Sequence, residues 1–285
     1  MAEGPSPPEF NTQVAHPARM YDYYLGGKTN FDADREAAEQ VLGVLPEGRD
    51  MAVANRMFLG RVVRYLAAEG IRQFVDIGTG IPSPGSTNEV ARAAAADARV
   101  VYVDNDPIVI AHARALLSGH SGGSATVVQA DLRAPDDILT RPALREVIDL
   151  AKPVAILLVA VLHFIQDSED PPGIVTRLKQ AMAPGSYLVI SHGTQDFNPE
   201  VARRAVGFYQ RATAPFVLRR KDEIAALFEG LQMVEPGLVQ LPFWRPQGEL
   251  PANVDRIWLY AGVGRKDPAG GQARSGRAVA APGPG

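Results

Sequence analysis

The stretch of sequence that decides the fold is Phe74-Val75-Asp76-Ile77-Gly78-Thr79-Gly80. A short apolar run that ends in a glycine turn is typical of a buried strand that leads to a ligand site. A second apolar run, over residues 99–104, ends in the carboxylate of Asp104. This pattern suits a nucleoside cofactor, because the backbone can approach the ligand at the glycines and an acid can accept the ribose hydroxyls.

The turn after the first run separates two classes of cofactor. A dinucleotide site needs a G-x-G-x-x-G spacing that opens directly into a helix. Here Gly78, Gly80 and Gly85 are interrupted by Pro82 and Pro84, which remove backbone donors and delay the helix. S-adenosylmethionine (SAM) has no pyrophosphate to bind, so this turn favours SAM over a nicotinamide dinucleotide. A strand–helix turn without any ligand is the alternative.

Three further apolar runs cover residues 125–131, 154–163 and 187–192. Their polar ends recur at intervals of about 30 residues, the length of one strand–helix–strand unit. Continuous Val, Ile and Leu runs indicate strands of a parallel sheet that are buried on both faces. Ligands bind at the carboxyl ends of such strands, so we expect one rim of the sheet to carry Asp76, Asp104, Asp131, His163 and His192.

Composition limits the classes of function. The 285 residues are 46% hydrophobic and carry a net charge of −3, which predicts a large core and no general attraction to nucleic acid. The chain has no cysteine, which excludes disulfides, thiolate metal sites and cysteine nucleophiles. The longest apolar stretch, residues 154–165, is too short to span a bilayer, and the first ten residues do not resemble a secretory signal. We therefore expect a cytoplasmic protein that binds neither nucleic acid nor membranes.

Four regions are expected along the chain. The first and last, residues 1–15 and 265–285, are rich in Pro, Gly and polar residues and are predicted to be disordered. Residues 16–70 are predicted to form a helical cap or lid, and residues 71–264 a cofactor-binding domain. Besides the five runs above, the patterns predict helices over residues 32–42, 50–69, 199–213 and 221–228, and strands over residues 232–239 and 256–263.

An unusual signature, Ala-Arg-Met-Tyr-Asp-Tyr-Tyr-Leu-Gly-Gly-Lys-Thr-Asn-Phe, covers residues 18–31. Together with the Asp-Ile-Gly-Thr-Gly-Ile-Pro turn and the Leu-Leu-Val-Ala-Val-Leu-His-Phe strand, it resembles an actinobacterial-type family of proposed SAM-dependent methyltransferases, long catalogued as a domain of unknown function. The resemblance runs from about Ala18 to Arg265. It implies SAM as cofactor and a class I methyltransferase fold, a Rossmann-like α/β structure whose seven strands follow the order 3-2-1-4-5-7-6. It implies no particular acceptor.

The signature itself suggests a lid. The rings of Tyr21 and Tyr24 can stack on adenine or close over a sulfonium, whose positive charge is attracted to a ring face. Gly26 and Gly27 permit backbone conformations that other residues avoid, and Lys28 is a further candidate for ligand contact. The alternative is that the tyrosines anchor an N-terminal helix to the core through their rings, with their hydroxyls at the surface.

Within a SAM site, the rim residues have distinct expected roles. Asp104 is predicted to accept both ribose hydroxyls, with Asn105 beside the adenine. Asp131 is predicted to accept from the adenine amino group, and the Leu132 N–H to donate to a ring nitrogen. The methionine part is expected against Asp76, which would face its ammonium group, and against Gly78, Thr79 and Gly80. The alternative role of each acid is a helix N-cap.

Methyl transfer from SAM requires alignment and the exclusion of water more than acid–base chemistry. His163 and His192 are the candidate catalytic residues, as bases or as orienting donors, because an imidazole exchanges protons near neutral pH. A structural histidine is the alternative for His163, and no metal is expected, since the pair lacks a third ligand. The leading hypothesis is a SAM-dependent methyltransferase that acts on O, N or C of a small molecule. The alternatives are a non-catalytic SAM sensor and a nicotinamide-dependent oxidoreductase.

Overall fold

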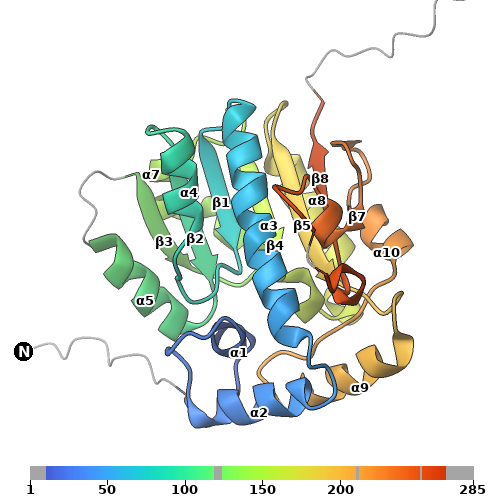
Figure 1. Cartoon of the computed structure of the whole chain (residues 1–285). Helices are drawn as coiled ribbons and strands as arrows, with labels where there is room; N and C mark the ends of the chain where they lie inside the picture. Colours follow the sequence, from blue (N-terminus) through green and yellow to red (C-terminus); the bar gives the residue numbers. More distant parts are fainter. Residues whose placement is uncertain (1–10, 119–123, 210–211, 251, 268–285) are drawn as a thin grey trace, which may run out of the picture.

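A central sheet covered by helices on both faces forms the body of the protein (Figure 1). The computed structural model describes residues 11–118, 124–209, 212–250 and 252–267. Most of both predicted tails, residues 1–10 and 268–285, lies outside the described residues. Of the residues of these predicted tails that are described, Ala15 is buried and Arg265 ends the last strand.

Five strands run parallel in the sheet, and the predicted strand order is confirmed. The order is β3-β2-β1-β4-β5-β8-β6, with β8 antiparallel to β5 and β6 and with β7 also paired to β8. The predicted strand over residues 232–239 is divided into two short ones, because Pro236 has no N–H to donate and Gly237 turns the chain with a φ of +84°. The strands are β1 (Gln73–Ile77), β2 (Arg99–Asp104), β3 (Ala125–Gln129), β4 (Ala155–Val159), β5 (Tyr187–Gly193), β6 (Gln232–Met233), β7 (Val239–Gln240) and β8 (Leu259–Arg265).

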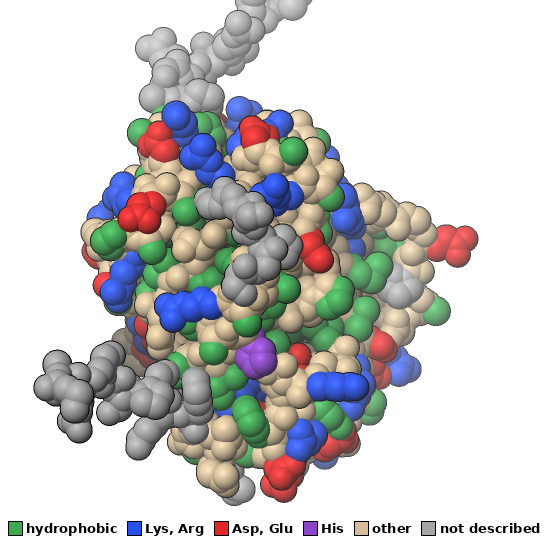
Figure 2. Space-filling view, turned by 90° about the vertical axis from the view of Figure 1, so that its left-hand side faces the viewer, with side chains coloured by type: hydrophobic (Ala, Val, Ile, Leu, Met, Phe, Trp, Pro, Cys, Tyr) green, Lys and Arg blue, Asp and Glu red, His purple; other side chains and the backbone are tan. Residues whose placement is uncertain are grey.

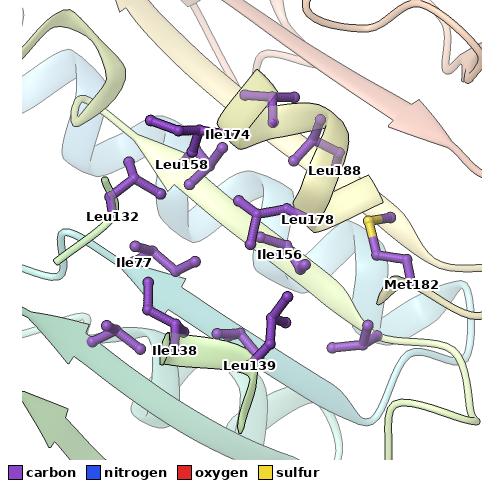
Figure 3. Packing of buried hydrophobic residues seen from close by; sticks show 14 of the residues in the cluster. Ile77, Leu132, Ile138, Leu139, Ile156, Leu158, Ile174, Leu178, Met182 and Leu188 are labelled. Atoms are coloured by element: carbon purple, nitrogen blue, oxygen red, sulfur yellow. The ribbon is translucent and has the colours of Figure 1, made fainter. Parts of the chain in front are cut away.

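Alternate residues of the parallel strands contribute to two separate hydrophobic clusters, one on each face of the sheet. In Figure 3, Ile156 and Leu158 of β4 lie against Ile174 and Leu178 of α8 (Pro171–Ala181). On the same face lie α6 (Pro135–Thr140), α7 (Pro142–Val147) and α10 (Lys221–Ala226). The opposite face is covered by α3 (Gly48–Ala68), α4 (Thr87–Ala94) and α5 (Pro107–Ser118). Burial on both faces explains the continuous apolar runs of the sequence.

A helical cap lies at one end of the sheet and is formed by α1 (Pro17–Tyr24), α2 (Asp32–Leu42) and α9 (Pro199–Tyr209) (Figure 1). The cap has its own hydrophobic cluster, in which Met20 and Val41 pack with Ala205 and with Trp258. The cap therefore draws on α9, which follows β5, and on the first part of the predicted residues 16–70, whereas residues 48–68 form α3 and cover a face of the sheet. Short 3-10 helices complete the connections: η1 (Leu162–Phe164), η2 (Asp167–Glu169), η3 (Leu241–Phe243) and η4 (Val254–Arg256).

Basic and acidic side chains are interspersed on the face of the molecule shown in Figure 2, with apolar side chains between them. No helix within the described ranges is both long enough and apolar enough to cross a bilayer.

Candidate active site

The glycine turn after β1 is built so that only glycine fits at its first position. Gly78 has a φ of +72°, and its N–H donates to the Val103 carbonyl at 2.8 Å. A Cβ at Gly78 would lie 2.3 Å from Cγ2 of Val161, a separation that side chains do not tolerate. Gly80 also has a positive φ, and its N–H donates to Oδ2 of Asp104 at 3.0 Å. The turn therefore joins the ends of β1 and β2, as the prediction for this stretch requires.

Asp104 lies at the end of β2, is buried and lines a cavity. Its Oδ1 accepts the Asp106 N–H at 3.0 Å and its Oδ2 accepts the Gly80 N–H. Burial raises the pKa of Asp104 to about 6, although these backbone hydrogen bonds oppose the shift. Each carboxylate oxygen has a further lone pair, so the ionised side chain can still accept two hydroxyl groups.

The raised pKa of Asp104 predicts a pH dependence of SAM binding. The ionised carboxylate accepts hydrogen bonds more strongly than the protonated acid, so the dissociation constant of SAM should rise as the pH falls through about 6. Isothermal titration between pH 7.5 and pH 5 should show a change that approaches about tenfold per pH unit at the acidic end. Asp104→Asn should bind SAM more weakly and lose this dependence. An equally steep dependence in Asp104→Asn would assign it to another group.

Asp76 and Arg56 form a second polar pair along the cavity. The Asp76 carboxylate is buried, accepts the Thr87 hydroxyl at 2.6 Å and lies 3.5 Å from the Thr79 hydroxyl. Burial raises its pKa, and the charge of Arg56 on α3 acts against that shift. Nη2 of Arg56 donates to the Ser83 carbonyl, whereas its buried Nε has no hydrogen-bond partner among the described residues. The Asp76 carboxylate suits the ammonium group of a zwitterionic methionine moiety, and the Arg56 guanidinium, whose Nε has no partner in the described part of the chain, suits its carboxylate group.

Asp131 and Asn105 lie side by side at the ends of β3 and β2, and both line the cavity with Leu132. Nδ2 of Asn105 donates to Asp131 at 3.0 Å, and the backbone and side chain of Arg133 also donate to Asp131. Burial disfavours the ionised form, but these hydrogen bonds and the charge of Arg133 outweigh it and hold the pKa of Asp131 below its ordinary value. The carboxylate is therefore ionised, and much of its acceptor capacity is already used by Arg133 and Asn105.

His163 lies on the cavity, but the prediction that its strand runs on to this residue is wrong. β4 ends at Val159, Ala160 adopts a φ of +57°, and the chain then turns through η1. Nδ1 of His163 accepts the Gly193 N–H at 3.2 Å, so the proton of the neutral ring is on Nε2. Burial, with the neighbouring His192 and the charge of Arg219, lowers the pKa of His163 well below its ordinary value. The ring is therefore neutral, and its Nδ1 lone pair is engaged.

His192 is not brought into the cavity. Its side chain is fully buried, Nδ1 lies 2.7 Å from the Gly193 carbonyl oxygen, and Nε2 lies 3.0 Å from Nη1 of Arg219. Arg219 can only donate, so Nε2 is the acceptor and Nδ1 carries the proton. Burial, with the charge of Arg219, lowers the pKa of His192 to about 3. The predicted role of His192 as a catalytic base or orienting donor therefore finds no support, because both of its nitrogens are used internally.

Two tyrosines of the signature line the cavity, and their hydroxyls are buried rather than at the surface. The Tyr21 hydroxyl donates to the Ala52 carbonyl at 2.9 Å and accepts from Nδ2 of Asn55. The Tyr24 hydroxyl lies 3.1 Å from the hydroxyl of Tyr209 in α9. Both side chains therefore anchor α1 to the rest of the fold and at the same time form part of the cavity wall.

The remainder of the signature forms a tight turn. A Cβ at Gly27 would lie 2.0 Å from Oδ1 of Asp22, and Oδ2 of Asp22 accepts from the Thr29 N–H and from Nδ2 of Asn30. Lys28 is exposed and is not among the residues that line the cavity. The predicted ligand contact of Lys28 is therefore not supported by its position.

The cavity extends from the strand ends to the helical cap and has a volume of about 290 Å³. Below the cap, four rings in mutual contact form what we call the aromatic wall: His163, Phe164, Tyr209 and Phe216. The imidazole of His163 stacks on Phe216 with ring centroids 4.1 Å apart. The cavity thus has a polar part at the strand ends, suited to a nucleoside, and an apolar part at the aromatic wall.

Sequence reasoning missed several residues of the site, namely Arg56, Arg133, Tyr209, Phe216 and Arg219. All five lie outside the strand ends on which the prediction concentrated. Residues 208–218 contain a cluster of aromatic and apolar residues, which was a weak signal for a wall of the cavity. Nothing in the local sequence distinguished the arginines from solvated surface charges.

Comparison with known proteins identifies the family. The chain matches the S-adenosyl methyltransferase family over residues 3–267. The structure of a DUF574 family protein from Streptomyces avermitilis is 42% identical, with a TM-score of 0.87, over 90% of this chain and 100% of that one. The structure of a proposed methyltransferase from Thermobifida fusca is 36% identical, with a TM-score of 0.85, over 93% of this chain and 100% of that one.

More distant comparisons concern the fold alone. An O-methyltransferase family protein from Burkholderia thailandensis is 14% identical, with a TM-score of 0.51, over 87% of this chain and 64% of that one. No curated protein matches the chain. Neither a nicotinamide-dependent oxidoreductase nor a non-catalytic sensor gains support from the family. The match over nearly the whole described chain and the two close structures agree: this chain belongs to the S-adenosyl methyltransferase family and is a SAM-dependent methyltransferase.

Proposed function

We propose that the protein transfers the methyl group of SAM to an O, N or C atom of a small molecule bound against the aromatic wall. The observation that carries this proposal is the continuity of the cavity, which reaches both the carboxylates at the strand ends and the rings below the cap. A donor and an acceptor can therefore lie next to each other in one continuous space, and close, oriented approach is the main requirement for an in-line transfer.

The strand ends are assigned to SAM, residue by residue. Asp104 is proposed to accept the ribose hydroxyls, and Asn105 with Asp131 and the Leu132 backbone to contact the adenine. Asp76 and Arg56 are proposed to pair with the ammonium and carboxylate groups of the methionine moiety, beside the turn formed by Gly78, Thr79 and Gly80. Bound SAM supplies a methyl group that is already activated on a sulfonium.

The protein's contribution to the transfer is orientation and the exclusion of water. Tyr21 and Tyr24 of the cap close the cavity above, and Phe164 and Phe216 limit it on the acceptor side. The hydrogen bond of the Tyr21 hydroxyl ties α1 to α3 on the sheet, and the contact between the Tyr24 and Tyr209 hydroxyls ties α1 to α9 within the cap. A cap held in this way keeps bulk water from the reacting atoms, which strengthens electrostatic interactions within the site.

Methyl transfer to a complex mixture of metabolites tests this proposal. The purified protein, incubated with SAM labelled in its methyl group and with a bacterial metabolite extract, should transfer label to small molecules. The label should depend on the protein and should decrease in Asp104→Ala. Tight binding of SAM without transfer to any component of several extracts would contradict the proposal and would favour a sensor.

A further inference from the structure

The apolar part of the cavity is shaped for a flat molecule. Phe216 lies parallel to His163, with an interplanar angle of 18°, and meets Phe164 edge-on at 5.2 Å. Tyr209 completes the cluster, with its ring centroid 5.2 Å from that of Phe216. Gly193 is necessary for this arrangement, because a Cβ there would lie 2.8 Å from Cζ of Phe216. Rings packed in this way present faces and edges that suit a planar, largely apolar compound.

Among the described residues, none of the titratable groups in this part of the cavity is placed to take a proton from an acceptor. His163 uses its Nδ1 lone pair on the Gly193 N–H, and Tyr24 and Tyr209 hydrogen-bond to each other. Burial raises the pKa of both tyrosines, that of Tyr209 to about 12, so both remain protonated and can only donate to an anion. The carboxylates that line the cavity belong to the strand ends, where Asp104 and Asp131 already have partners.

A buried positive charge lies behind the aromatic wall. Arg219 is 5% exposed, and its Nη1 donates to the Leu162 carbonyl at 3.0 Å and lies 3.0 Å from Nε2 of His192. Its Nη2 donates to the Ile165 carbonyl and to Asp167. Asp167, the counter-charge that pairs with Arg219 in the described part of the chain, is 81% exposed, so solvent screens it. The charge of Arg219 therefore contributes an attraction for an anion at the wall and a repulsion for a cation there.

We infer that the acceptor is a planar, largely apolar compound with an acidic hydroxyl group, a phenol or an enol, that binds at the aromatic wall and is methylated as its oxyanion without a protein base. This inference rests on the proposed function and names its acceptor class. The acceptor oxygen gains the methyl carbon, and the electron pair of the broken carbon–sulfur bond stays on sulfur. No proton moves in this step, and both the negative charge of the acceptor and the positive charge of the donor disappear. An apolar surrounding favours such a loss of charge.

Binding of 4-nitrophenol in the presence of S-adenosylhomocysteine tests the inference without any turnover. The oxyanion of 4-nitrophenol is yellow and its neutral form is not, so absorbance reports which form is bound. We expect saturable binding of the yellow form and a lower pKa for the bound phenol than for the free one. Binding of the colourless form, or no saturable binding up to the solubility limit, would overturn the inference.

Two pairs of variants locate the binding site at the aromatic wall. Phe216→Ala should raise the dissociation constant of 4-nitrophenol about tenfold, whereas Phe243→Ala should not change it, because Phe243 is exposed and outside the cavity. Tyr24→Phe should also weaken binding, since it removes a donor, whereas the neighbouring Tyr23→Phe should have no effect, because the Tyr23 hydroxyl contacts Glu39 at the surface. Equal effects within each pair would place the binding site elsewhere.

Transfer kinetics separate the inference from the proposed function. With a series of substituted phenols, the inflection in the pH profile of kcat/KM should follow the pKa of each phenol. With SAM saturating at every pH, one fixed inflection for the whole series would reveal a protein base and overturn the inference. Methylation of 4-methylaniline but of no phenol would overturn the acceptor class and leave the proposed function intact. SAM binding without methyl transfer to any acceptor would contradict the proposed function itself.

Discussion

Replacing Arg19 by methionine is expected to lower the free energy of unfolding by about 3–5 kcal/mol, the usual effect of leaving buried charges without their partner. Arg19 is 2% exposed, and its Nε lies 3.6 Å from Asp34 and 3.5 Å from Asp106, which are 0% and 6% exposed. His16 lies 3.2 Å from Asp106, but burial lowers its pKa, so the imidazole of the wild type supplies no second positive charge there. Urea denaturation followed by circular dichroism measures the change.

Arg49→Met is the matched control in the same helical cap. Arg49 pairs with Glu39 on the surface, where the two side chains are 42% and 56% exposed. Such pairs contribute about 0–1 kcal/mol, so this variant should unfold almost like the wild type. If Arg19→Met and Arg49→Met lose the same stability, the buried network does not hold the cap on the sheet.

Asp104→Ala is expected to weaken SAM binding by about 1.5–3 kcal/mol, the range for hydrogen bonds that involve a charged group. This loss corresponds to a dissociation constant roughly 10 to 150 times higher at neutral pH. The fold should persist, because burial already disfavours the ionised carboxylate in the free protein, as the raised pKa of Asp104 shows. Isothermal titration with SAM and a thermal melt of the same sample measure the two properties.

Asp97→Ala provides the comparison for Asp104→Ala. Asp97 precedes the amino end of β2, is 76% exposed and pairs with Arg72 on the surface. Its removal should leave the SAM affinity unchanged. An Asp104→Ala variant that is folded and binds SAM like Asp97→Ala would refute the ribose assignment.

The elements with a strong local signal could be predicted from the sequence. A helix was predicted over residues 32–42 from the acids of the first turn and the spacing of the apolar residues, and α2 lies there. The five buried runs gave the parallel strands, and the two prolines after Gly80 predicted a delayed helix, which begins at Thr87. The order of the strands came from the family resemblance, because periodicity carries no information on which strands are neighbours.

The histidine roles could not be predicted, because they depend on contacts far along the chain. The apolar run over residues 154–163 gave no sign that Ala160 would adopt a positive φ and end β4. His192 lies in β5, but the apolar run does not show which side of the sheet its side chain faces. The contact of its Nε2 with Arg219 depends on a segment 27 residues away. A strand end identifies a rim; it does not identify the direction of each side chain.

The tyrosine–glycine signature, residues 18–31, contains residues with two different roles in the structure. Asp22 and Gly27 form a structural turn, whereas Tyr21 and Tyr24 join the cavity wall through hydrogen bonds to α3 and α9. The sequence could not show that α9 lies against α1, since the two helices are almost two hundred residues apart. Removing the signature would therefore remove part of the hydrophobic cluster of the cap along with two tyrosines of the cavity wall.

The contact between Tyr24 and Tyr209 has a consequence for how acceptor preference can diverge among related chains. The groups assigned to SAM come mainly from the first half of the chain, whereas Phe164, Tyr209 and Phe216 come from the second. A chimera that exchanges residues 194–218 would leave the SAM groups untouched but would bring a new α9 against the old α1 and α2. A new acceptor specificity should therefore be transferred only when residues 194–218 and the helices α1 and α2 are taken together from the same related protein.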